Sequence, residues 1–324
     1  MFKKLFVIAL LFNTLNADVA QRVFGSSPPM TYLIYTLAPQ KLAGLNFAPS
    51  NINNLASPTL LDASFLDLPI IGSFHGGGSS INIETLLSHK VDLILFWEDD
   101  FLASKVSTEL AKTGIKRVDL KFRRIADMPA SILKAGEAMG EVSRAKELST
   151  HAQKLIDELT LITKDAPKVR YYYAEGADGL QTECSDSFHT EAMQIAGGEN
   201  VHKCTQSNVL GLEKITFETL LGYNPEVIIA QNAQTLKAIK EDPLFLHLDA
   251  LKQNRVFVAP NDPFNWLDRP PSFMRLLGMH FIAKEFYPEL YSYDLVAKTV
   301  EFYKLFLRVD LSKSEAKQIL GEKQ

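Results

Sequence analysis

The sequence predicts an α/β fold in which two similar lobes are joined by a long, rigid helix. Helix-like and strand-like patterns alternate along most of the 324 residues, and this alternation is typical of α/β proteins. A helix–turn–strand sequence occurs twice, and an almost purely helical segment separates the two occurrences. The length also suits two domains of about 150 residues each.

The repeated sequence reads INIETLLSHKVDLIL from Ile81 and ITFETLLGYNPEVII from Ile215. In each copy, three apolar residues fall on one face of the expected helix: Ile83, Leu86 and Leu87 in the first, and Phe217, Leu220 and Leu221 in the second. An apolar strand is expected after each helix, at 91–96 and at 227–230. Coincidence is one explanation, because such units are common in α/β proteins. The other is that the chain contains two equivalent halves.

Further strands are expected where short apolar runs are bounded by turn residues, at 18–27, 117–120, 169–173 and 255–259. Pro28-Pro29 and Pro270-Pro271 each predict a helix start, because proline is favoured in the first helical turn. Between residues 126 and 165 the pattern is helical and lacks a strand. A helix over 141–164 would span about 36 Å at 1.5 Å per residue. Since it is rich in helix formers, it would hold the lobes at a nearly fixed separation.

The N-terminus has the pattern of a secretory signal peptide covering residues 1–17. Lys3 and Lys4 precede an apolar stretch that runs to Phe12, and the small residue Ala17 ends the segment. A membrane span would need about 20 apolar residues, and no cysteine follows that could carry a lipid anchor. We therefore expect an exported protein that is soluble after cleavage.

The charge balance argues against nucleic acid as a partner. Without the signal peptide the chain has 32 basic and 38 acidic residues, a net charge of −6. Binding to nucleic acid depends on an excess of basic residues at the contact surface.

Export changes the interpretation of Cys184 and Cys204, because disulfides persist in oxidising compartments. The intervening sequence reads as a helix ended by Gly197-Gly198, which would let the chain return and bring the two sulfur atoms together. We favour a disulfide. The alternative is a metal site that also uses His189 and His202, although the spacing fits no compact zinc motif.

Several segments together resemble those of a known family. They are the signal peptide, NIETLLSHKVDLIL, the helical connector, GLQTECSDSFHTEAMQIAGGENV and NWLDRPPSFMRLLG. In this order they resemble class III substrate-binding proteins of ABC importers, which capture ferric siderophores, vitamin B12 and other metal chelates outside the inner membrane.

The resemblance implies two Rossmann-like lobes with a ligand cleft between them. It places the N-terminal lobe at 18–140, the connecting helix at 141–166 and the C-terminal lobe at 167–324. It also implies a periplasmic location, a monomeric protein and a permease dimer of the inner membrane as partner. Glu84 and Glu218, at the start of the two repeated helices, would dock on that permease. The alternative for each is a carboxylate that only stabilises its helix N-terminus.

The sequence SFHGGGSS is the first candidate for ligand contact. Gly76 and Gly77 allow the backbone to approach a ligand closely, Ser79 offers a hydroxyl, and His75 could ligate a metal or donate to an anion. A phosphate-binding loop is a poor alternative because no Gly-Lys-Ser/Thr follows. His75 could also be an ordinary loop residue.

Two tryptophans and an arginine are further candidates. Trp97 ends a strand and could stack on a flat ligand, although tryptophan is more often a core residue. Arg269 would recognise carboxylate or catecholate oxygens, and Trp266 would provide an apolar surface. Alternatively, Asp268 and Arg269 pair with one another.

Two more ligand contacts, Asp178 and Gln181, are implied by the resemblance alone. His189 begins an expected helix, and we interpret a lone histidine there as structural.

The function expected from the resemblance is binding without catalysis. No cofactor is expected to be permanently bound, and the transported ligand would be a small metal complex of iron or nickel. A protein that binds molybdate or tungstate is the main alternative, for which Arg269 and helix N-termini would suffice. A secreted hydrolase is a weaker one, because Gly-x-Ser-x-Gly, His-Glu-x-x-His and dinucleotide motifs are all missing from the sequence.

Overall fold

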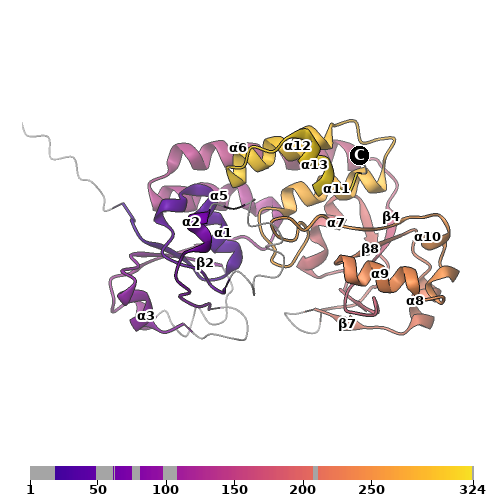
Figure 1. Cartoon of the computed structure of the whole chain (residues 1–324), viewed down its shortest axis with the longest axis horizontal. Helices are drawn as coiled ribbons and strands as arrows, with labels where there is room; N and C mark the ends of the chain where they lie inside the picture. The colour runs from indigo at the N-terminus through magenta and orange to yellow at the C-terminus, as the bar shows by residue number, and fades with distance from the viewer. Residues whose placement is uncertain are drawn as a thin grey trace, which may run out of the picture.

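The computed structural model describes residues 19–48, 61, 63–74, 81–97, 108–206 and 211–322. The expected signal peptide therefore lies outside the described residues. Figure 1 shows a chain with two sheet-containing halves side by side and long helices along one edge.

The strands form two parallel sheets and one small antiparallel pair. The first sheet has the order β1-β2-β3 and the second β6-β4-β8-β9, while β5 pairs with β7. The strands are β1 Val23–Gly25, β2 Leu93–Trp97, β3 Lys116–Leu120, β4 Val169–Ala174, β5 Gln181–Thr182, β6 Gly198–Asn200, β7 Glu213–Lys214, β8 Val227–Ala230 and β9 Val256–Val258. Every residue of β2 and β8 is buried, because parallel sheets are covered on both faces. The predicted α/β class is confirmed.

The α-helices of the described residues lie between these strands and after the last of them. They are α1 Pro28–Leu37, α2 Ala63–Leu66, α3 Ile83–Ser88, α5 Met128–Met139, α6 Val142–Thr163, α7 Glu191–Ile195, α8 Phe217–Tyr223, α9 Ala233–Glu241, α10 Asp249–Lys252, α11 Arg275–Phe286, α12 Leu295–Phe302 and α13 Lys313–Ile319. The helix start expected at Pro28 is present. The one expected at Pro270 is wrong, because a turn in which the Ser272 amide donates to the Pro270 carbonyl (2.7 Å) precedes α11.

The repeated sequence forms the same structure twice, as α3 followed by β2 and as α8 followed by β8. Asn82 caps α3 and Thr216 caps α8, each accepting a hydrogen bond from the backbone amide three residues later (2.7 and 3.2 Å). Each helix is followed by a residue with positive φ, 56° at Lys90 and 39° at Asn224. The two sequence copies therefore share their capping and turn geometry.

The equivalence extends to the strand that pairs with the strand of each repeat, β1 beside β2 and β4 beside β8. The Arg22 amide donates to the Asp92 carboxylate (3.1 Å), and the Arg170 amide donates to the Glu226 carboxylate (2.8 Å). Both arginine side chains then donate to backbone carbonyls at the C-terminal end of the repeated helix. Such agreement over an arginine, an acidic residue and a helix end favours two equivalent halves over coincidence.

The expected apolar face of each repeated helix is only partly buried. Leu86 and Leu220 are fully buried as expected, but Leu87 and Leu221 are 48% and 44% exposed. The helices have only six and seven residues and pack through a single turn. The fifth residue of each therefore points along the surface rather than into the core.

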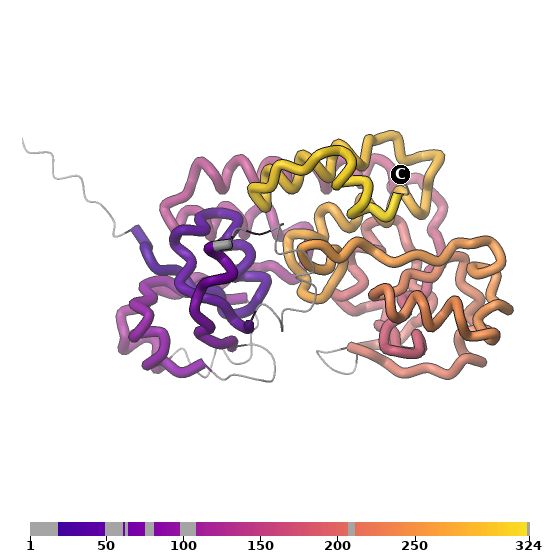
Figure 2. Tube along the Cα trace, in the orientation of Figure 1, coloured from indigo at the N-terminus to yellow at the C-terminus, as the bar shows by residue number. Residues whose placement is uncertain are grey.

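Helix α6 corresponds to the expected connector. Gly140, with φ of 74°, separates it from α5, so the helical segment is broken once rather than continuous. In Figures 1 and 2, α6 runs along the edge that the two halves share, and α12 lies beside it. Lys298 of α12 forms an ion pair with Glu158 of α6.

The C-terminal segment returns to the N-terminal half. The hydroxyl of Tyr35 in α1 donates to the Leu307 carbonyl (3.4 Å), and the Arg308 side chain donates to the carbonyls of Thr36 and Leu37 (3.3 and 3.2 Å). The largest buried cluster accordingly contains residues from both halves, from Ala20 to Leu320. Residues near 308, which were expected to belong to the C-terminal lobe, thus also contribute to the N-terminal half.

Candidate functional site

A group of charged side chains gathers at the carboxyl edge of the second sheet. Glu175 directly follows β4 and Gln231 directly follows β8, so the parallel strands bring them to one edge. Gln231 Nε2 donates to Glu175 Oε1 (2.8 Å). Arg269 reaches the same place from the long segment after β9. This edge is where open α/β sheets usually bind ligands.

The loop after β4 doubles back on itself. The Glu175 amide donates to the Gln181 carbonyl (2.7 Å), and the Gln181 amide donates back to the Glu175 carbonyl (3.2 Å). Gly176 and Gly179 make this return with φ of 75° and 72°, a conformation that strains other residues. The loop places Glu175 and Glu183 on the same side of the sheet edge.

Arg269 is bound by three carboxylates. Its Nε lies 3.1 Å from Glu175 Oε1 and 3.2 Å from Asp268 Oδ2, and its Nη2 forms a short ion pair with Glu183. The three acidic side chains are completely buried, whereas that of Arg269 is 26% exposed. The group, which we call the Arg269 cluster, therefore has more acidic than basic side chains.

The pKa values in the Arg269 cluster follow from burial and charge. Burial raises the pKa of Glu175, and the nearby Asp268 raises it further. Burial alone would lower the pKa of Arg269, but Asp268 and Glu175 outweigh it and raise that pKa. Burial would raise the pKa of Asp268, but His189 and Arg269 outweigh it and lower that pKa. The guanidinium thus stays charged, and the Glu175 carboxyl binds a proton more readily than an exposed glutamate does.

A second set of contacts links the two halves. The fully buried Arg275 donates to the carbonyls of Phe122 and Arg123 (2.8 and 2.9 Å), and it lies 3.3 Å from a carboxylate oxygen of Glu191. Burial lowers the pKa of Arg275 to about 10. The same Glu191 oxygen accepts from the Ile125 amide (2.9 Å). Residues after β3 are thereby held against the start of α7.

Aromatic contacts lie at the same junction. Trp97, at the end of β2, meets Phe188 edge to face with ring centroids 6.1 Å apart. The Arg123 guanidinium lies over the Phe188 ring at 5.0 Å. Trp97 is only 6% exposed. Its ring therefore packs at the junction of the two halves and offers little surface on which a ligand could stack.

Trp266 does not provide a ligand surface. It is fully buried, its ring contacts Phe281 and Tyr303, and its Nε1 donates to the Asp262 carbonyl (2.9 Å). The expectation is wrong because the indole fills the core beneath α11. Arg269 is likewise engaged by carboxylates, which agrees with the alternative that it pairs with Asp268 and extends that pairing to two further residues.

The remaining candidates differ in what the structure says of them. Asp178 is exposed and accepts from the Leu180 amide (3.1 Å), and Gln181 is half-buried in the loop after β4. The glycine-rich candidates His75, Gly76, Gly77 and Ser79 lie outside the described residues. Glu84 and Glu218 are both exposed, at the same position of their helices.

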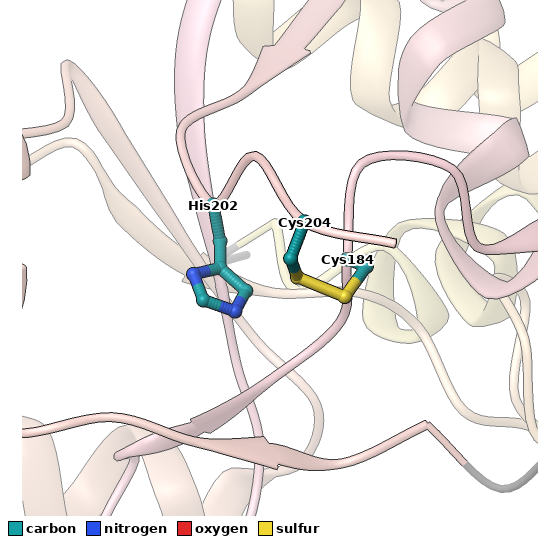
Figure 3. A group of neighbouring side chains, drawn as sticks. All are labelled: Cys184, His202 and Cys204. Carbon is teal, nitrogen blue, oxygen red and sulfur yellow. A yellow bond between two sulfur atoms is a disulfide. The ribbon is translucent and has the colours of Figure 1, made fainter. Parts of the chain in front are cut away.

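Cys184 and Cys204 form a disulfide with an S–S distance of 1.99 Å. Figure 3 shows His202 beside it, and the ligand atoms of the three residues lie within 4.8 Å of one another. His202 Nδ1 is 3.0 Å from the Tyr223 hydroxyl, and burial lowers the pKa of His202. Because both sulfur atoms are used in the bond, neither is a thiolate ligand here.

Sequence reasoning missed Glu175 and Glu183 as site residues. A signal existed, since both are acidic residues that flank the glycine-containing loop after β4. Nothing in the sequence indicated that Arg269, about ninety residues later, would meet them. Only the fold brings the three together.

A family model described as periplasmic binding protein matches residues 74–263, which is more than half of the chain. The chain belongs to the periplasmic binding protein family. This confirms the class III resemblance and makes the protein a binding protein rather than an enzyme. It is the solute-binding component of an ABC transporter, with a permease as partner and a small molecule as ligand.

Individual relatives of this periplasmic binding protein have different ligands in their names. A solved ABC transporter solute binding protein from Sulfurospirillum deleyianum is 38% identical, with a TM-score of 0.87 over 93% of this chain and 94% of that chain. The molybdate-binding protein MolA of Haemophilus influenzae is 26% identical over 268 residues, 74% of each chain. A vitamin B12-binding protein of Vibrio vulnificus is 22% identical over 291 residues, 88% of this chain and 97% of its own.

Within the described part of this periplasmic binding protein, we find no helix with the length and apolar character needed to cross a membrane.

Proposed function

We propose that this protein captures a metal chelate outside the inner membrane and delivers it to the permease. The cargo would be an iron(III) complex of the siderophore type or a nickel complex. The observation that carries the proposal is the acidic excess of the Arg269 cluster, in which three buried carboxylates face one guanidinium. The net negative charge of this cluster attracts a positively charged metal centre and repels a free anion.

The proposal includes the architecture and the docking mode expected for the family. The ligand would sit between an N-terminal lobe at 18–140 and a C-terminal lobe at 167–324, with α6 holding their separation. His75 of the glycine-rich loop is proposed to ligate the metal. Residues 1–17 would direct export and then be removed, leaving a monomer that acts in the periplasm.

Glu84 and Glu218 are proposed to dock on the two permease subunits. Their exposure and their matching positions support this, because one carboxylate on each lobe would fix the orientation of the complex. Stabilisation of the helix N-terminus would explain each glutamate taken singly. It would not require the two glutamates to occupy the same position in both repeats.

Molybdate is the second candidate ligand. The relative named for molybdate, at 26% identity, favours it. The carboxylates around Arg269 argue against it, because they already occupy the guanidinium that an oxyanion would need.

Tryptophan fluorescence separates these ligands, since the chain has only two tryptophans. The purified protein is titrated with ferric siderophores, with nickel in the presence and absence of histidine, and with molybdate. Trp97 at the lobe junction should report binding, and the core residue Trp266 should not. We therefore expect one metal chelate to quench at one-to-one stoichiometry in wild type and in Trp266→Phe, and the quenching to be lost in Trp97→Phe. Quenching by molybdate alone would refute the metal-chelate proposal.

A further inference from the structure

His189 lies at the meeting point of the two halves. It belongs to the short helix η5 Phe188–Thr190, and its amide donates to the hydroxyl of Ser187 (3.2 Å). Its ring lies against Phe188 with centroids 4.0 Å apart, and Phe188 in turn contacts Trp97 of β2. His189 is only 5% exposed.

Nε2 of His189 is buried and has no hydrogen-bond partner among the described residues, while Nδ1 faces a single carboxylate oxygen at 3.5 Å. A buried polar atom without a partner costs about 1–3 kcal/mol, and native proteins rarely leave one in that state. A purely structural role for His189 provides no interaction that offsets this free-energy cost. A bound ligand that supplies a partner for the nitrogen would offset it.

The surroundings of His189 match those of a metal-bound histidine. Nδ1 faces Asp268 Oδ2 at 3.5 Å, and Asp268 Oδ1 accepts a hydrogen bond from the Tyr173 hydroxyl (2.8 Å). Histidines that ligate metals usually direct their second nitrogen at a carboxylate, which fixes the ring and increases its basicity. Here the carboxylate is fully buried and itself held in place, so Nε2 is the nitrogen left for a metal.

We propose that His189 Nε2 ligates the metal of the transported complex, with Asp268 and Tyr173 as positioning residues. This rests on the proposed function and narrows it. The cargo is a chelate that leaves at least one coordination position of the metal open, since a chelator that fills every position has no place for an imidazole. The acidic excess of the Arg269 cluster, which includes Asp268, favours such a metal centre beside the ring.

The test compares two chelates of the same metals. Nitrilotriacetate supplies four donor atoms and leaves coordination positions of Ni²⁺ and Fe³⁺ open to a protein ligand, whereas ethylenediaminetetraacetate supplies six and leaves at most one position, held by water. Binding is measured by equilibrium dialysis with wild type, His189→Gln and His247→Gln. His247 is exposed, so its variant controls for nitrilotriacetate complexes that attach to surface histidines.

We expect wild type and His247→Gln to bind one equivalent of a nitrilotriacetate complex and His189→Gln to bind it at least about tenfold more weakly. In Tyr173→Phe, affinity should fall by about two- to tenfold. With Cu²⁺ nitrilotriacetate as a spectroscopic probe, nitrogen hyperfine splitting from the protein should appear in wild type and Tyr173→Phe and vanish in His189→Gln. The persistence of the splitting in Tyr173→Phe distinguishes a positioning role from general damage, and circular dichroism checks that each variant folds.

Equal binding by His189→Gln and wild type would overturn the inference, and so would equal binding of the two chelates. In both cases the proposed function would stand. If wild type binds neither chelate of either metal, the inference fails, and a parallel titration with molybdate then decides whether the proposed function fails with it.

Discussion

Replacing Arg269 with Met should destabilise the protein by about 3–5 kcal/mol at pH 7.5. The substitution keeps most of the apolar side chain and removes the cation that three carboxylates share. Glu175, Glu183 and Asp268 are completely buried, so solvent cannot replace the lost contacts. Breaking a buried ion pair by removing one partner typically costs this much. Lys252, paired with Asp249 at 3.1 Å on the surface, is the matched control, and Lys252→Met should cost less than about 1 kcal/mol.

The pH dependence of this loss tests its cause. Burial and the nearby Asp268 raise the pKa of Glu175 and Arg269 opposes this, so in the folded variant the pKa of Glu175 lies still further above that of the unfolded chain. Stability from such groups is fully present below the unfolded pKa and is lost as pH rises through the folded pKa. Urea unfolding from pH 5 to pH 8 should therefore show a deficit in Arg269→Met that is small at pH 5 and grows towards pH 8. A deficit below about 1 kcal/mol at pH 7.5, or one that does not change with pH, would refute the reasoning.

The remaining predictions concern a buried histidine and the docking glutamates. Burial lowers the pKa of His280 to about 4 from 6.5, with its nitrogens bound to the Tyr291 hydroxyl and the Leu155 carbonyl. The contribution of His280 to stability is thus present above pH 6.5 and is lost as pH falls towards 4, by about 3 kcal/mol in all. When urea unfolding is measured at pH 7.5 and pH 4.5, His280→Gln should therefore lose less stability on acidification than wild type. An equal loss in the two proteins would contradict this. Glu84→Gln and Glu218→Gln should each reduce stimulation of the permease ATPase by about three- to tenfold and leave ligand affinity unchanged. The exposed control Glu289→Gln should match wild type, and full stimulation by both docking variants would remove the docking role.

The sequence predicted most of the fold because its local patterns agree with the tertiary structure. The strand expected at 227–230 is β8 as it stands, and the helix expected at 141–164 differs from α6 by one residue at each end. Buried parallel strands and long helices have the clearest patterns. The false helix start at Pro270 shows the limit of a local rule, since proline is equally common in turns.

The candidate site was less predictable because its energetics depend on partners distant in sequence. Arg269 considered alone is a suitable anion receptor, but Glu175 and Glu183, 94 and 86 residues away, change that role. Trp266 considered alone suits a flat ligand, but α11 and the π-helix Tyr303–Leu307 enclose it. The type of a residue determines which interactions its side chain can make. Its burial and its neighbours in the fold determine which of those interactions it makes.

The two equivalent halves also differ where their chemistry matters. Arg22 with Asp92 and Arg170 with Glu226 repeat one structural device at the amino ends of the strands. At the carboxyl ends the repetition stops: β1 is followed by Ser26 and Ser27, which precede α1, whereas β4 is followed by Glu175 and its turn. The two halves thus have equivalent strands, and the different residues that follow β1 and β4 give the carboxyl edges of the two sheets different chemistry. The buried carboxylates at and after the end of β4 would draw the metal centre of an asymmetric ligand towards the C-terminal half.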